Sequence, residues 1–215
     1  MLDVLASFVT GGYLPYFVYL STECNRLVAV LESDDLIVQT SAQGFLIEDT
    51  RFVISNFISS DFFIITVQLA NEGDSSMIEE LKSNFTDDVA IAFSAPLEIP
   101  ETGQVTFWTD KKTPDQIINI SSGDYEVFVT GRISTYQDVA AFPDLETDLE
   151  AYWNNHVKIF FDEEENLSDD LGENWVMFEA ERKPNVLTIT FIPVDEPVET
   201  QVYLPKRRPI DRSGR

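Results

Sequence analysis

Residues 116–134, which read QIINISSGDYEVFVTGRIS, decide the fold of this 215-residue chain. Within them Tyr125, Val127 and Val129 occupy every second position, and other residues stand between them. A period of two over this length is typical of a strand with two distinct faces. We therefore expect residues 125–133 to form a strand near the middle of a sheet, with these three side chains on one buried face.

A turn precedes this strand at residues 121–124, which read SSGD. Gly123 can take a positive φ, and the side chain of Asp124 can bond its own backbone. Before the turn, Ile118 and Ile120 again alternate with polar residues. The stretch therefore predicts either a β-hairpin or a tight corner that leads into the long strand.

Short apolar runs separated by turn residues occupy most of the chain before this stretch. Their spacing predicts antiparallel strands. The strands expected here are 16–21, 26–31, 36–40, 45–48, 51–58, 61–69, 88–95 and 104–109, with the run 61–69 buried on both faces. A short helix is expected at residues 2–9, and Pro96 and Pro100 predict an irregular link after residue 95.

The clearest helix signal is SSMIEELKSN, from Ser75 to Asn84. Ser75 or Ser76 can cap its start, and Glu79 stands three residues after Ser76, as in a capping box.

The chain after residue 134 predicts a helix at 145–153, a strand at 157–161 and an acidic loop at 162–173. A hairpin of 174–181 with 186–194 and an edge strand at 201–204 follow. The fold class is mainly β (α+β), an antiparallel β-sandwich-like domain with two or three short helices. We expect one domain over residues 1–204, with a split near 134–143 as the alternative, and a flexible basic tail over 205–215.

The formal net charge of −24 repels nucleic-acid phosphates and anionic lipid surfaces. It fits a basic protein partner, or it serves only to keep the chain soluble. The apolar run of residues 1–20 opens without a basic residue and is broken by Gly11-Gly12 and Pro15, so we expect neither a signal peptide nor a membrane helix. The single cysteine, Cys24, favours a reducing, cytoplasmic location.

No motif in the sequence predicts an enzyme or a cofactor. One cysteine and one histidine, His156, are too few for a zinc site built from these residues. The glycines fit neither the dinucleotide nor the nucleoside-triphosphate loop. Acidic residues are so abundant that a pair of them does not single out acid–base catalysis. The aromatic residues are interpreted as core side chains rather than a stacking surface; they are Phe62, Phe63, Trp108, Tyr152, Trp153 and Trp175.

The acidic loop DEEENLSDDLGE partly matches the pattern of a calcium-binding loop. Its ligand positions fit in part, but Leu167 occupies the sixth position, where the calcium loop turns on a glycine. The loop is therefore interpreted as a solvated surface or a protein-contact surface, with weak cation binding as a further alternative. The candidate partner-binding residues are Asp162, Glu163, Glu164, Glu165, Asp169 and Asp170.

One family resemblance covers part of the chain, from residue 51 to residue 134. It consists of the strand RFVISNF (51–57), an apolar strand, a short acidic helix, the strand DDVAIAFSA (87–95) and the segment SGDYEVFVT (122–130). This order resembles the competence protein J family of small nuclease inhibitors. The resemblance implies a non-enzymatic acidic protein that blocks a basic nuclease by occupying its substrate site, and it carries over no inhibitory residue.

Three kinds of function are consistent with the sequence. The first is a non-enzymatic acidic binding or inhibitor module that blocks a basic nuclease or toxin. The second is a structural or assembly subunit of a bacterial or phage complex, which a large exposed apolar patch would favour. The third is an enzyme or small-ligand binder, which would need a cavity with convergent polar groups.

Overall fold

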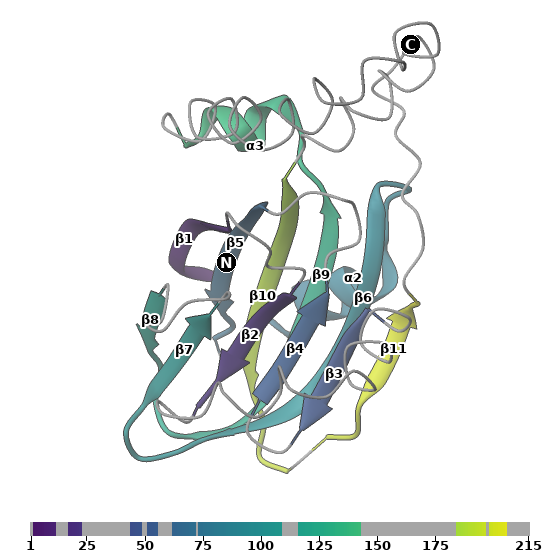
Figure 1. Ribbon diagram of the computed structural model, residues 1–215. Helices are drawn as coiled ribbons and strands as arrows, with labels where there is room; N and C mark the ends of the chain where they lie inside the picture. Colours follow the sequence, from purple (N-terminus) through teal and green to yellow (C-terminus); the bar gives the residue numbers. More distant parts are fainter. Residues whose placement is uncertain are drawn as a thin grey trace, which may run out of the picture.

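The computed structural model of the chain describes residues 2–11, 17–22, 44–48, 51–55, 62–71, 73–108, 116–142, 184–196 and 198–205. These residues form two β-sheets that face each other, as the sequence predicts for a sandwich-like fold (Figure 1). Two short helices accompany the sheets in this part of the chain, and neither is long and apolar enough to cross a membrane.

The larger sheet has six strands in the order β1-β5-β10-β9-β6-β11. Its strands are β1 (Asp3–Gly11), β5 (Phe62–Leu69), β6 (Val89–Ile99), β9 (Gly123–Ile133), β10 (Asn185–Pro193) and β11 (Gln201–Leu204). Neighbours in this sheet are antiparallel except β5 and β10, which run parallel.

The smaller sheet has five antiparallel strands in the order β3-β4-β2-β7-β8. Its strands are β2 (Phe17–Ser21), β3 (Phe45–Glu48), β4 (Arg51–Ser55), β7 (Gln104–Trp108) and β8 (Gln116–Asn119). These strands lie in front of the larger sheet in Figure 1.

Strand β9 is the interior strand that the alternating sequence predicts. It pairs with β10 on one side and with β6 on the other along almost all of its length. Tyr125, Val127 and Val129 are buried in the main core, which confirms the prediction. Glu126 and Phe128 are buried as well, because helix α2 covers the opposite face of the strand there.

The main core lies between the two sheets. Its largest fully buried side chains include five phenylalanines drawn from both sheets: Phe52, Phe63, Phe93, Phe107 and Phe191. The rings of Phe45 and Phe93 stack across the sandwich with centroids 4.0 Å apart. Burial of each such side chain contributes about 1.5–3 kcal/mol, so packing between the facing sheets stabilises the described part of the chain. Phe62, Phe63 and Trp108 are buried, as the core interpretation requires.

Two of the crossings from one sheet to the other lie at adjacent corners. One crossing joins β6 to β7 through the turn at Glu101-Thr102-Gly103, and the other joins β8 to β9. The amide of Ile120 donates to the carbonyl oxygen of Gly103 at 2.8 Å and ties the two crossings together. Of the two alternatives left open by the sequence, the tight corner is therefore correct, because β8 and β9 belong to different sheets.

The buried side chain of Tyr125 stabilises the corner between β8 and β9. Its hydroxyl donates to the carbonyl oxygen of Ser121 at 3.0 Å. A phenol is protonated at neutral pH, and burial raises the pKa of Tyr125 further, so the hydroxyl remains a hydrogen-bond donor.

Two helices cover parts of the outer face of the larger sheet. Helix α2 (Ser75–Ser83) places Ile78 against Phe128 and Ile192, and its Lys82 reaches Glu126 on β9. Helix α3 (Tyr136–Ala140) was not predicted, and it brings Val139 onto a separate small cluster with Ile64 and Val186.

The predicted start of α2 is wrong in detail. Asp74 is the N-cap residue, and its carbonyl oxygen accepts from the amides of Met77 and Ile78. Ser75 and Ser76 already lie inside the first turn, so neither caps the helix through a capping box with Glu79.

The helix predicted at residues 2–9 is also wrong, because this segment is strand β1. Leu5, Ala6 and Phe8 pack against the main core while Val9 packs on the opposite face of the sheet. A strand inside a two-layer fold can bury apolar side chains on both of its faces in this way. An amphipathic helix would bury them on one face only.

Two further predictions need correction. Strand β6 continues through Pro96 to Ile99, where an irregular link was expected. A proline is tolerated there because β11 pairs with β6 only from Ala92 to Ser94, which leaves one paired edge at Pro96. The predicted hairpin partner of β10 is wrong, because β5 and β9 occupy both edges of β10.

Several predicted elements lie outside the described residues. They are the strands at 26–31, 36–40 and 157–161, the helix at 145–153, the acidic loop at 162–173, the segment 174–181 and the basic tail after residue 205.

The corner at Gly103 provides a test of the crossing. Gly103 has φ +62°, and a Cβ there would lie 2.8 Å from the carbonyl oxygen of Ile120. We expect Gly103→Ala to lower the free energy of unfolding by about 2–4 kcal/mol, since a strained backbone and a steric clash add together. Denaturant unfolding measures the change.

Gly73→Ala is the matched control. Gly73 also has a positive φ, +99°, but nothing lies within 4 Å of its added Cβ. This variant should lose only about 1 kcal/mol, from backbone strain alone. Equal losses for the two variants would contradict the close approach of the two crossings.

Candidate functional site

An exposed group of carboxylates lies where β6 ends and β9 begins. Asp124 and Glu98 are aligned directly opposite each other on these neighbouring strands, and both are exposed. The amide of Val194 donates to the carbonyl oxygen of Asp124 at 3.1 Å, which brings the exposed residues Asp195 and Glu196 to the same end of the sheet.

Glu101, in the turn after β6, adds a further exposed carboxylate. We call Glu98, Glu101, Asp124, Asp195 and Glu196 the acidic rim. It lies at the lower end of the larger sheet in Figure 1, at the opposite end from α3.

The acidic rim is electrostatically unfavourable for the folded chain. Like charges directly opposite each other on neighbouring strands destabilise the pair. The basic side chains that the structure describes are Lys82 and Arg132, and each already has an acidic partner. Lys82 Nζ lies 2.6 Å from Glu126 Oε2, and Arg132 Nη2 lies 2.7 Å from Asp138 Oδ1. The fold therefore brings several carboxylates to one end of the sheet, and neither of the two described basic side chains is paired with them.

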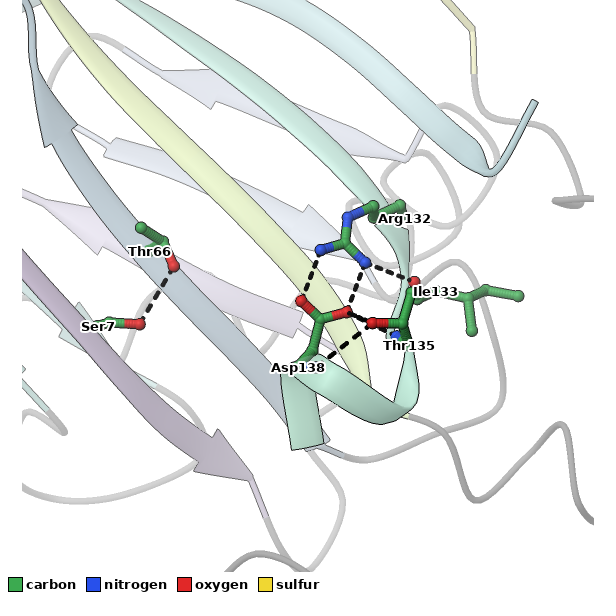
Figure 2. A network of polar contacts seen from close by, with 6 residues as sticks. All are labelled: Ser7, Thr66, Arg132, Ile133, Thr135 and Asp138. Carbon is green, nitrogen blue, oxygen red and sulfur yellow. Dashed lines mark hydrogen bonds and ion pairs between the residues drawn. The ribbon is translucent and has the colours of Figure 1, made fainter. Parts of the chain in front are cut away.

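A polar network occupies the other end of β9 (Figure 2). Both terminal nitrogens of Arg132 donate to the carboxylate of Asp138 at 2.7 Å, and Nη1 also donates to the carbonyl oxygen of Ile133. The amide and hydroxyl of Thr135 donate to Asp138 Oδ2 at 2.6 and 2.7 Å. Thr135 accepts in turn from the amide of Asp138, which completes a capping box at the start of α3.

The ionised form of Asp138 is strongly favoured by this network. Partial burial acts to raise the pKa of the carboxyl, but the hydrogen bonds from Arg132 and Thr135 outweigh burial and lower it to about 2. The hydrogen bonds that Arg132 donates to Asp138 also raise the pKa of Arg132. The network is therefore a fixed ion pair that anchors α3 to β9 rather than a group poised for proton transfer.

The predicted partner-binding residues lie outside the described residues, and so do Cys24 and His156. Those six candidates are Asp162, Glu163, Glu164, Glu165, Asp169 and Asp170. The described chain stops at Phe142, after α3, and resumes at Pro184, whose carbonyl oxygen accepts from the amide of Ser134 at 3.0 Å. Among the described residues, no group of three or more His, Cys, Asp or Glu side chains could hold a metal ion.

The acidic rim was missed in the sequence because its members are far apart along the chain. The sequence pattern indicates only a turn residue at Asp124, and Glu98 and Asp195 stand in segments with no motif. Strand pairing brings the three segments together, and pairing was not predictable from local patterns. The one available signal is that each of these acidic residues stands close to one end of a predicted strand.

Comparison with known proteins gives a weak likeness of fold. No protein-family model and no curated protein sequence match this chain. The structure of ComJ from Bacillus subtilis, an inhibitor of the DNA-degrading activity of NucA, aligns with a TM-score of 0.47 and 9% identity over 90% of this chain and 99% of ComJ. The crocagin biosynthetic gene J product aligns with a TM-score of 0.44 and 13% identity over 90% and 98% of the two chains. The resemblance to competence protein J is thus confirmed as a weak one.

The Asp138 network makes stability depend on pH. Its carboxyl has a folded pKa of about 2 against an ordinary value of 3.8, so the stabilisation is complete above about pH 5 and is lost as pH falls through 4 towards 2. We expect Asp138→Asn to cost on the order of 1 kcal/mol at pH 7, because solvent screens a partly exposed pair. The difference from wild type should shrink below pH 4 in urea unfolding.

Glu80→Gln is the control for this prediction, since it removes one negative charge from an exposed position on α2. Its effect at pH 7 should be small. A wild-type advantage over Asp138→Asn that stayed constant from pH 7 to pH 2 would show that the ion pair does not stabilise the fold.

Proposed function

We propose that this chain is a non-enzymatic acidic module that binds a basic protein and inhibits it by covering its substrate-binding surface. A nuclease or a toxin is the kind of partner that fits. Enzymes that act on nucleic acids present positive charge to the phosphate backbone, so an acidic protein can compete for the same surface. The net charge of −24 supplies the required sign over the whole molecule.

The observation that carries the proposal is the acidic rim. Glu98 and Asp124 are held opposite each other by strand pairing, and the backbone bond from Val194 to Asp124 fixes the chain that carries Asp195. Rigidly held like charges cost folding free energy through repulsion. A basic partner would offset this cost on binding, and preorganised charges lose little conformational entropy when they bind.

The acidic segment 144–173 is a second part of the proposal. It carries eleven Asp and Glu residues against the single Lys158. The described residues that flank it, Phe142 and Pro184, belong to the end of β9 that carries the Arg132 network, whereas Asp124 opens β9 at the other end. The two acidic regions can therefore be neutralised separately in an experiment.

ComJ inhibits a DNA-degrading activity, which is the same kind of action as the one proposed. The proposal is supported by the negative charge of this chain and by the position of the exposed carboxylates, rather than by that weak likeness.

The assembly-subunit alternative would need a large exposed apolar patch. The exposed large hydrophobic side chains of the described residues are single residues on four different elements: Val4 on β1, Leu81 on α2, Ile117 on β8 and Val202 on β11. Scattered apolar residues of this kind are normal on a protein surface. The described part of the chain therefore favours the acidic binding module.

The test begins with recovery of the partner from the native host at low salt, followed by association kinetics with the purified partner and an assay of its activity. Neutralising the rim with Glu98→Gln, Asp124→Asn, Asp195→Asn and Glu196→Gln should slow association by about tenfold or more and flatten its salt dependence. Dissociation should change less. The same four substitutions should leave stability unchanged or slightly higher, because they relieve repulsion.

A parallel variant carries Asp162→Asn, Glu163→Gln, Glu164→Gln and Glu165→Gln, and it reports on the acidic segment in the same way. The control is Glu79→Gln with Glu80→Gln on the exposed side of α2, which should leave association nearly unchanged. Recovery of the same proteins in equal amounts by wild type and both neutralised variants would contradict the proposal, as would a partner whose activity the wild-type chain does not reduce.

A further inference from the structure

Strand β1 is an edge strand of unusual length for this molecule. Within the described residues its one sheet neighbour is β5, and its other edge faces away from the sheet. The other three edge strands, β3, β8 and β11, have four residues each, whereas β1 has nine. A long edge presents a row of backbone donors and acceptors that another strand can pair with.

The usual protection of an edge strand is weak in β1. Residues 4–11 read VLASFVTG and contain no charged residue and no proline. An irregularity in the pairing lies between Val4 and Ala6, at one end of the strand. From Ala6 to Gly11 the register with β5 is unbroken, so this part of the strand is regular.

We propose that β1 pairs with β1 of a second copy of this chain, antiparallel across a two-fold axis, so that the two larger sheets become one. An antiparallel strand edge is self-complementary, because a two-fold rotation aligns its donors with its own acceptors. The seam is uncharged, so it offers a basic partner no carboxylate to bind. It also lets two copies meet without like charges at the contact.

The alternation of side chains restricts the register of this pairing. Residues opposite each other on neighbouring strands point to the same face, so the two residue numbers must sum to an even number. Within the regular part of the strand, an axis at Ser7 places Ser7 opposite Ser7 of the second copy and Ala6 opposite Phe8, two residues that share the core face. This choice leaves Thr10, which already makes another interaction, outside the seam.

Ser7 is exposed and can occupy the axis without a change in the fold. Its hydroxyl lies 3.2 Å from the hydroxyl of Thr66 on β5, on the face of the sheet that Figure 2 shows. Opposite Cα atoms in an antiparallel pair are about 4.5–5.5 Å apart, which is within the range that a disulfide spans.

Cysteine cross-linking tests the pairing directly. In a Cys24→Ser background, Ser7→Cys should form a disulfide-linked dimer under oxidation in about 1 M salt, and reduction should return it to the 24.4 kDa chain. The matched control is Ser76→Cys, an exposed serine of α2, which should cross-link at least about tenfold more slowly. Equal rates for the two variants would overturn the proposal.

Sedimentation equilibrium provides a second test of dimerisation, which needs no introduced cysteine. Because each copy carries a charge of −24, association should strengthen as salt rises, opposite to the salt dependence expected for a basic partner. Ser7→Lys should weaken dimerisation by about tenfold or more, since two ammonium groups would meet at the axis. Unchanged dimerisation in this variant, or a monomer at all salt and protein concentrations, would overturn the proposal and leave the inhibitor function untouched.

Discussion

The burial of β9 on both faces is the constraint on which the rest of the structure depends. One face contributes Tyr125, Val127 and Val129 to the core between the sheets, and the other lies under α2 at Phe128. A strand buried in this way must satisfy its backbone bonds on both edges, because water cannot replace them. β6 and β10 meet that requirement, although they come from distant parts of the chain.

This arrangement also places the charged groups. The start of β9 lies at the corner where the chain crosses between sheets, and strand ends gather there with their exposed acids. The end of β9 carries Arg132, whose ion pair with Asp138 anchors α3. One end of the larger sheet therefore exposes the acidic rim, while the other end carries an internal ion pair. The proposed function assigns binding to the acidic rim and, as its second part, to the acidic segment 144–173.

The parts of the fold that local patterns encode could be predicted from the sequence. Alternation predicts β9, the apolar run predicts β5, and the residues from Ser75 to Ser83 predict α2. Competing patterns explain the errors: the apolar spacing in residues 2–9 fits one helix face, but burial on two faces makes it a strand. The sequence predicts a capping box at Ser76, whereas this kind of motif is formed by Thr135 and Asp138.

Non-local pairing could not be predicted in the same way. The parallel alignment of β5 with β10 joins residues more than a hundred positions apart and leaves no periodic trace in either strand. The acidic rim depends on such pairings, since Glu98 and Asp124 meet only because β6 and β9 are neighbours. The composition predicted an acidic surface, but its position on the sheet needed the register of the strands.

Amide hydrogen exchange of β9 tests most directly the claim that this strand holds the fold together. Its amides between Tyr125 and Gly131 should exchange only through global unfolding, with free energies equal to that of the whole domain. The amides of the edge strand β11 should exchange through smaller local openings, with free energies several kcal/mol lower. Exchange of β9 as fast as that of β11, at the same pH and temperature, would contradict the account.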